Sequence, residues 1–231
     1  MPSTKLPLAN ISIHPFEKSD LEPAFRLSEA AFADLNELLY TSPLSKTSIE
    51  AFLAPRYASF GTEPNSHSFK AVDSETGALA GISRWTIYEE DQEVDKSVSE
   101  IVEERLSVRI PERRDDELRK MYTIIQEGKR DLLSVSSAEY TAGKGDGVKY
   151  KKRVELENLA VHPDYQGQGI ARRLLQWGIE EAARLGLDVH LEATRAGRPV
   201  YERMGFEVLR TVPYGGEGGE TEVTFMVLPA K

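Results

Sequence analysis

Residues 154–171 read VELENLAVHPDYQGQGIA, and this stretch decides the fold. A β-strand is predicted over residues 149–161, because apolar and polar side chains alternate around Val154. A turn with two glycines follows, and apolar residues that recur on one face predict a helix over residues 169–185. Successive backbone N–H groups at the start of such a helix can hold a diphosphate. Residues 166–171 are therefore a candidate anion site, while a Gly-x-Gly turn also serves to let a strand meet a helix closely.

The flanking segments predict further strands and helices. A strand over residues 11–16 precedes a helix that begins near Ser19 and Asp20. Five residues of this helix share one face at helical spacing: Leu21, Phe25, Ser28, Ala31 and Phe32. The other predicted elements are a helix over residues 47–60, a hairpin of 68–73 and 78–88, strands over 187–193, 206–212 and 221–228, and a short helix over 198–204.

A strongly charged segment separates the hairpin from the strand at 149–161. Residues 89–140 predict two amphipathic helices that are broken near Pro111. These helices form either a solvated cover over the sheet or a lid that shapes a substrate site. Glycine-rich loops are predicted at residues 141–147 and 214–219.

Composition excludes several classes of protein. The 231 residues contain no Cys and carry a formal net charge of −9, which argues against disulfides, Cys-ligated metals and a main role in binding nucleic acid. The acidic balance favours a cationic partner. No apolar run approaches the roughly 18 residues of a membrane span, and residues 1–8 do not read as a secretory signal. We therefore expect a protein of the cytoplasm without a bound metal.

The string Gln-x-x-Gly-x-Ala at 166–171 follows NLAVHP at 158–163 and precedes YERMGF at 201–206. Together these strings resemble the acetyl-CoA signature of the GNAT superfamily of N-acetyltransferases. The resemblance implies an α/β fold with a mixed, twisted sheet of six or seven strands, helices on both faces and a helical insertion. We expect one domain over residues 1–231, with the insertion at about 89–140 and the acetyl-CoA-binding core at about 154–212.

The resemblance also assigns roles to particular residues. It implies that the backbones of Leu159 and Val161 bind the pantetheine arm, and that Tyr201 gives a proton to the departing thiolate. Six residues would surround the diphosphate: Gln166, Gly167, Gln168, Gly169, Ile170 and Ala171. Arg172 and Arg173 lie just beyond, where they either meet the phosphates or form a solvated helix face.

Glu155 and Glu157 are candidates for the general base that removes a proton from the ammonium of the acceptor. Strict alternation predicts both on one face with Leu159 and Val161, opposite a second set of four residues: Val154, Leu156, Asn158 and Ala160. The carboxylates are equally suited to pairing with Lys152 or Arg153, or to attracting a cationic substrate. The sequence does not decide between these roles.

The predicted function is transfer of an acetyl group from acetyl-CoA to a small primary amine by direct attack in a ternary complex. A protein Lys or N-terminus is the alternative acceptor, and a non-catalytic acyl-CoA-binding module is the alternative class. A homodimer is compatible with the sequence. The elbow Gly-x-Ser-x-Gly of Ser hydrolases is absent.

Overall fold

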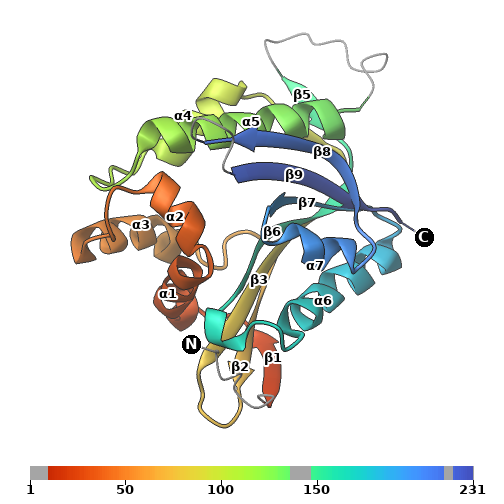
Figure 1. The fold of residues 1–231 in the computed structure, drawn as a ribbon. Coiled ribbons are helices and arrows are strands. Elements are labelled where there is room, and N and C mark those ends of the chain that lie inside the picture. Colours follow the sequence, from red (N-terminus) through yellow and green to blue (C-terminus); the bar gives the residue numbers. More distant parts are fainter. Residues whose placement is uncertain (1–9, 136–146, 216–220, 231) are drawn as a thin grey trace.

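The computed structural model describes residues 10–135, 147–215 and 221–230. Within these residues, a mixed seven-stranded sheet has the order β1-β2-β3-β6-β7-β9-β8 (Figure 1). The strands are β1 (Ile11–Pro15), β2 (Ser66–Asp73), β3 (Leu79–Tyr88), β6 (Arg153–Val161), β7 (Val189–Thr194), β8 (Glu207–Tyr214) and β9 (Thr221–Leu228). The helices are α1 (Leu21–Ala31), α2 (Ala33–Leu39), α3 (Lys46–Ser59), α4 (Val98–Leu106), α5 (Asp115–Leu133), α6 (Ile170–Leu185) and α7 (Arg198–Glu202). The predicted fold class is confirmed.

Some sequence predictions fall outside the described residues. These are the reading of residues 1–8, the end of the charged segment at 136–140, most of the loop at 141–147 and residues 216–219 of the second glycine loop. Helix α2 was not predicted. The strand predicted at 149–161 is in fact two strands, because β5 (Val148–Tyr150) leaves the main sheet and pairs with β4 (Gln92–Val94).

Helices cover both faces of the sheet. Helix α6 packs on one face against β3 and β6, and Tyr201 of α7 joins the same apolar cluster. On the other face α1 packs against Ile82 and Ala160, and α5 lies across β8 and β9 (Figure 1). Gly186, in the left-handed conformation, caps the C-terminus of α6 directly after the predicted helix end at residue 185.

The close approach of α6 to the sheet depends on Gly178. A Cβ at this position would lie 2.5 Å from three atoms of the Trp85 ring, and Trp85 is completely buried. We expect Gly178→Ala to lower the free energy of unfolding by about 1–3 kcal/mol, because neither the indole nor the helix backbone has room to move. Urea unfolding followed by circular dichroism measures this loss. The exposed neighbour Glu180→Ala serves as the control, and an unchanged Gly178→Ala protein would contradict the packing.

A β-bulge interrupts the pairing of β6 with β3. Asn158 pairs with Arg84 and Leu156 with Trp85, so Glu157 is an extra residue without a partner. The extra residue changes which side chains share a face. Strict alternation therefore gave a wrong prediction for part of the strand.

The apolar clusters show which side of the sheet each side chain of β6 faces. Leu156 and Leu159 pack in one cluster with α6, while Ala160 packs against α1 on the other face. Val161 also packs with the α6 residues, and Asn158 faces the side of α1. The even-numbered and odd-numbered residues thus exchange faces at the bulge.

Strands β6 and β7 run parallel and separate at the same point. Their pairs are Val154 with Val189, Glu155 with His190, and Leu156 with Leu191. Beyond Leu156 no described strand pairs with this edge of β6. The separation leaves a free strand edge in the middle of the sheet.

Candidate functional site

The turn before α6 has the backbone that the sequence suggests. Gly167 and Gly169 both have positive φ, at 76° and 77°, a conformation that favours glycine. Gly169 is the N-cap of α6 and forms no side-chain cap, so the first N–H groups of the helix have no side-chain acceptor at that position. This arrangement fits the diphosphate of coenzyme A.

The free edge of β6 leads toward this turn. The N–H of His162 donates to the carbonyl of Ala80 on β3, so alternation along the strand turns the amides of Val161 and Leu159 to the opposite, free edge. Gln166 Nε2 donates to the carbonyl of Val161 at 3.1 Å, which links the strand to the turn. The edge is suited to an extended ligand that bonds like an added strand.

The two Arg residues after the turn differ in their hydrogen-bond partners. Arg172 is exposed. Arg173 Nη1 donates to the carbonyl of Ile11 at 2.7 Å, so this side chain ties α6 to β1. Of the two, Arg172 stays the better prediction for a phosphate contact.

Glu155 lies in a buried ion cluster beneath α5. Its carboxylate pairs with Lys129 of α5, and Arg153 Nη2 lies 2.9 Å away. Burial alone raises the pKa of Glu155, but the ammonium of Lys129 and the guanidinium of Arg153 lower it by more, so the pKa lies well below its usual range. A carboxylate held in this way is a weak base.

Lys129 also lies 3.7 Å from Glu192 of β7. The cluster therefore joins α5 to both strands, next to their last paired residues Leu156 and Leu191. Arg153 is a predicted partner that the structure confirms. Lys152, the other predicted partner, does not pair with Glu155. Its side chain is exposed, and its backbone N–H donates to the carboxylate of Asp91.

Glu157, the bulge residue, is more accessible. Its side chain is 32% exposed, accepts a hydrogen bond from Thr86 Oγ1 at 2.6 Å and lies 2.8 Å from Arg84 Nε. Arg84 also pairs with Glu63 at 2.5 Å. Because Thr86 and Arg84 turn away from α6, the Glu157 carboxylate lies on the α1 side of the sheet.

Tyr201 is buried in α7, and its ring packs edge-on against Phe206 at 5.8 Å between ring centres. Burial raises the pKa of Tyr201, so the phenol stays protonated near neutral pH. Burial is the one cause of this shift, with no contribution from a hydrogen bond between the hydroxyl and a described residue, so the donor is available to a ligand. Phe206 is itself a buried core residue.

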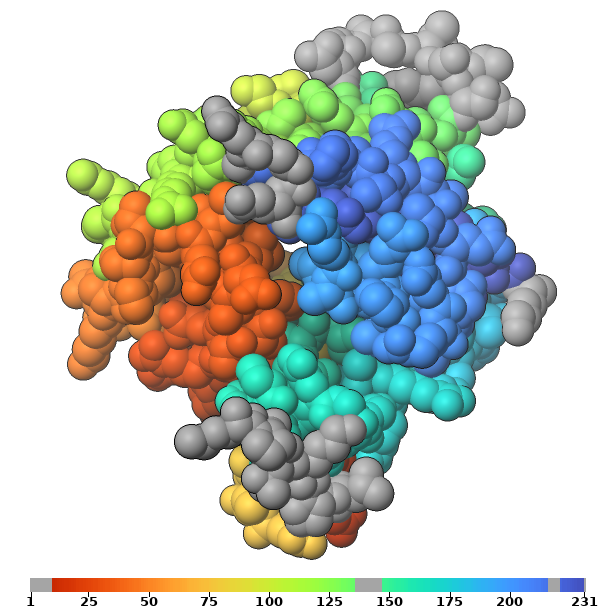
Figure 2. Space-filling view, in the orientation of Figure 1, coloured from red at the N-terminus to blue at the C-terminus, as the bar shows by residue number. Residues whose placement is uncertain are grey.

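A cavity of about 890 Å³ opens on the α1 side of the sheet. It lies between α1, α2, α3 and strands β2, β3 and β6, and Asn158 beside the bulge forms part of its lining. The surface is hollowed between the orange N-terminal helices and the blue C-terminal strands (Figure 2). The cavity is large enough for a small molecule.

The helix face predicted for α1 faces the cavity rather than the sheet. Four of its members line the cavity, namely Leu21, Phe25, Ser28 and Phe32, while Ala24 and Leu27 form the buried face of α1. The charged segment contributes as well, since Arg114 lines the cavity and Glu112 accepts hydrogen bonds from Ser45 and Ser48 at the start of α3. The segment thus covers β8 and β9 through α5 and also reaches the cavity.

Comparison with known proteins identifies the central part of the chain. Residues 133–208 match the model of the acetyltransferase (GNAT) domain family. The probable acyltransferase SID5 of Ajellomyces capsulatus is 43% identical over 42 residues, which are 18% of this chain and 31% of that protein. Residues 133–208, which match the family model, contain strand β6, the glycine turn and helix α6.

Solved structures extend the likeness to the whole chain. Arylalkylamine N-acetyltransferase 2 from Aedes aegypti is 17% identical, with a TM-score of 0.62 over 96% of this chain and 100% of that chain. A polyamine N-acetyltransferase of Drosophila melanogaster is 14% identical, with a TM-score of 0.60 over 95% of this chain and 100% of that chain. These likenesses establish the GNAT fold, and the predicted resemblance is confirmed.

Two further observations concern only the described residues. They include no helix that is both long and apolar enough to cross a membrane. They also bring together no group of three or more side chains of the kinds that ligate metals.

Proposed function

Because residues 133–208 match the GNAT acetyltransferase domain family, we propose that this chain transfers an acetyl group from acetyl-CoA to the primary amine of a small molecule. The observation that carries the proposal is the free edge of β6, which runs directly into the left-handed glycine turn before α6. An extended arm along Leu159 and Val161 would end with its diphosphate at residues 166–171. The two proposed binding surfaces would then form one continuous path.

Acetyl-CoA supplies the thioester carbonyl that the amine attacks and the sulfur that leaves. A neutral amine is required for attack, and we assign removal of its proton to Glu157, directly or through one water. Glu157 is preferred over Glu155, because Glu155 is buried and paired with two cations. Asn158, the residue after Glu157, lines the cavity. The cavity therefore lies beside this carboxylate and is the proposed acceptor site.

Tyr201 is proposed to donate a hydrogen bond from its hydroxyl to the leaving sulfur. A thiol has a pKa of about 8.5, below that of a phenol, so the hydroxyl stabilises the thiolate as a donor and completes proton transfer only as the products separate. The amine and the thioester meet directly, and no group of the protein becomes acetylated.

The acceptor is proposed to be a small amine on two grounds. The formal net charge of −9 favours approach of a cation. The fold is shared with enzymes that are named for arylalkylamines and polyamines.

Calorimetry with coenzyme A and an amine screen for coenzyme release test the proposed function. We expect binding of coenzyme A and acetyl-CoA, release of the thiol only when an amine is present, and no burst of thiol proportional to enzyme in its absence. Failure to bind either form of the coenzyme would refute the assignment. Peptide arrays in the same assay distinguish a protein acceptor.

Tyr201→Phe removes the hydroxyl and keeps the ring against Phe206. We expect kcat to fall about 10- to 100-fold, with the Kd for acetyl-CoA changed less than about threefold, because the donor acts on the departing sulfur. Single-turnover kinetics and calorimetry separate the two effects. The opposite pattern, weaker binding with unchanged kcat, would remove Tyr201 from the chemistry.

A further inference from the structure

Aromatic side chains form part of the wall of the cavity. Phe25 of α1 and Phe52 of α3 pack with their ring centres 5.1 Å apart, and Phe16 and Phe60 form a second pair at 6.4 Å. All four line the cavity. These walls are suited to the apolar or aromatic body of a ligand.

Arg56 is a cation set among these rings. Its guanidinium carbon lies 3.6 Å from the centre of the Phe52 ring, and Nη1 donates to the carbonyl of Phe52 at 2.6 Å. The stacking and the hydrogen bond hold the guanidinium in one orientation. Arg56 is exposed and lines the cavity, so the N–H groups that do not bond to Phe52 are available to a ligand.

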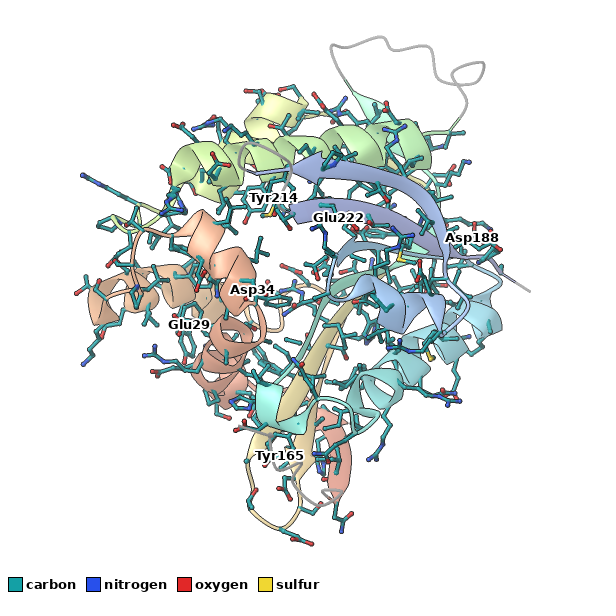
Figure 3. The ribbon with its side chains drawn as sticks, viewed as in Figure 1. Glu29, Asp34, Tyr165, Asp188, Tyr214 and Glu222 are labelled. Atoms are coloured by element: carbon teal, nitrogen blue, oxygen red, sulfur yellow. The ribbon has the colours of Figure 1, made fainter. Side chains whose placement is uncertain are left out.

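No described carboxylate neutralises Arg56. Glu29, labelled in Figure 3, lines the same cavity but pairs with Arg26 at 3.1 Å. Tyr40 also lines the cavity, and burial raises the pKa of its phenol, so it offers Arg56 no negative charge near neutral pH. Burial, together with the like charge of Arg84, lowers the pKa of Arg56.

The other two cations of the cavity are already used. Arg84 pairs with Glu63 and Glu157. Arg114 Nη1 donates to the carbonyls of Glu37 and Leu38 at the end of α2. Arg56 and Arg114 thus both lack an anion among the described residues, but Arg56 is the one that stacks on an aromatic ring of the cavity, and a bidentate partner such as a carboxylate fits it.

We propose that Arg56 binds an anionic group, most simply a carboxylate, at the far end of the acceptor amine. The acceptor class is then a primary amine with an apolar or aromatic body and a terminal carboxylate. Its amine would lie toward Asn158 and Glu157, and its body against the paired Phe rings. This inference rests on the proposed acetyl transfer.

A matched pair of amines tests the inference. Para-(aminomethyl)benzoate carries the carboxylate, and para-methylbenzylamine has a methyl group in its place. We expect the carboxylate compound to have the higher kcat/KM by about 10- to 100-fold, and Arg56→Gln to remove that advantage while it changes kcat/KM for the methyl compound less than about threefold. Arg56→Lys should keep part of the advantage, since it retains the charge but loses the bidentate geometry.

Lys46→Gln is the control, because it removes one positive charge from the same helix at a side chain that is 91% exposed. It should leave the preference unchanged. Equal kcat/KM for both amines, or an advantage that survives Arg56→Gln, would overturn the inference and leave acetyl transfer intact.

Binding is measured separately from turnover. Calorimetry with para-(aminomethyl)benzoate in the presence of coenzyme A should show binding to the wild type and a Kd raised at least about tenfold in Arg56→Gln. The same Kd in both proteins, or no binding to the wild type, would overturn the inference even if no amine were acetylated. Binding of coenzyme A itself, which should be the same in both, reports on the proposed function.

Discussion

Glu157→Gln is expected to lower kcat about 100-fold or more, with coenzyme binding and folding preserved. The amide keeps the size of the side chain and can still accept the hydrogen bond from Thr86. It cannot take a proton from the attacking amine, and a positioned general base is worth about 10²–10⁴ in rate. Steady-state kinetics with the best amine of the screen, together with calorimetry for acetyl-CoA, measure the effect.

Glu63→Gln is the matched control, because Glu63 and Glu157 both pair with Arg84. If the loss in Glu157→Gln came only from releasing Arg84, the Glu63 variant would show a similar loss. We expect the Glu63 variant to keep kcat within about fivefold of the wild type, since it removes an exposed ion pair and no base. A Glu157→Gln enzyme as fast as the wild type would exclude this carboxylate as the base.

Lys129→Met is expected to lower the free energy of unfolding by about 3–5 kcal/mol, the largest loss of stability that we predict. The substitution leaves Glu155 and Glu192 facing each other beneath α5 without the ammonium that lies between them. The Glu155 side chain is only 5% exposed, so water cannot replace the lost cation. Urea unfolding at pH 7 measures the loss.

Lys120→Met on the same helix is the control, because its ion pair with Glu117 has a Lys side chain that is 62% exposed. Its expected effect is within about 0.5 kcal/mol. Lys129→Met combined with Glu155→Leu removes one charge of each sign and should recover part of the stability. A single Lys129→Met variant within about 1 kcal/mol of the wild type would contradict the cluster as described.

The local sequence pattern was sufficient to predict most strands of the sheet and most of its helices. The alternation in β1, the turn before β3 and the helical spacing in α6 are properties of neighbouring residues, and the structure has elements at each of these places. Helix α2 was missed because it begins two residues after α1 ends, so that its pattern reads as a continuation of that helix. Boundaries of this kind depend on packing rather than on propensity.

The site was harder to predict than the fold. Glu155 and Glu157 are equivalent in the sequence, and only tertiary structure distinguishes them, because the partner Lys129 is 26 residues away along the chain. The apolar stripe of α1 has the spacing of a core face, yet Phe25 and Phe32 line a cavity. Hydrophobic spacing predicts which side of a helix avoids water but not whether protein or a ligand covers it.

Arg56 gave no signal in the sequence. It follows Pro55 in a helix whose residues carry both charged and aromatic side chains, and nothing local marks it as a ligand group. Its relation to Phe52 is the ordinary spacing of one helical turn. The features that distinguish it are its place among the aromatic rings of the cavity and the lack of a carboxylate partner among the described residues, and both exist only in three dimensions.

The bulge at Glu157 has a consequence for how the length of this protein can vary. Leu156 before it and Leu159 after it already face α6, as they would in a regular strand with one residue fewer. Removing Glu157 alone would therefore shorten the chain without turning any other side chain of β6 to the wrong side. The sheet can be built without this amino acid, so a homologue that lacked it would keep the architecture and lose the carboxylate.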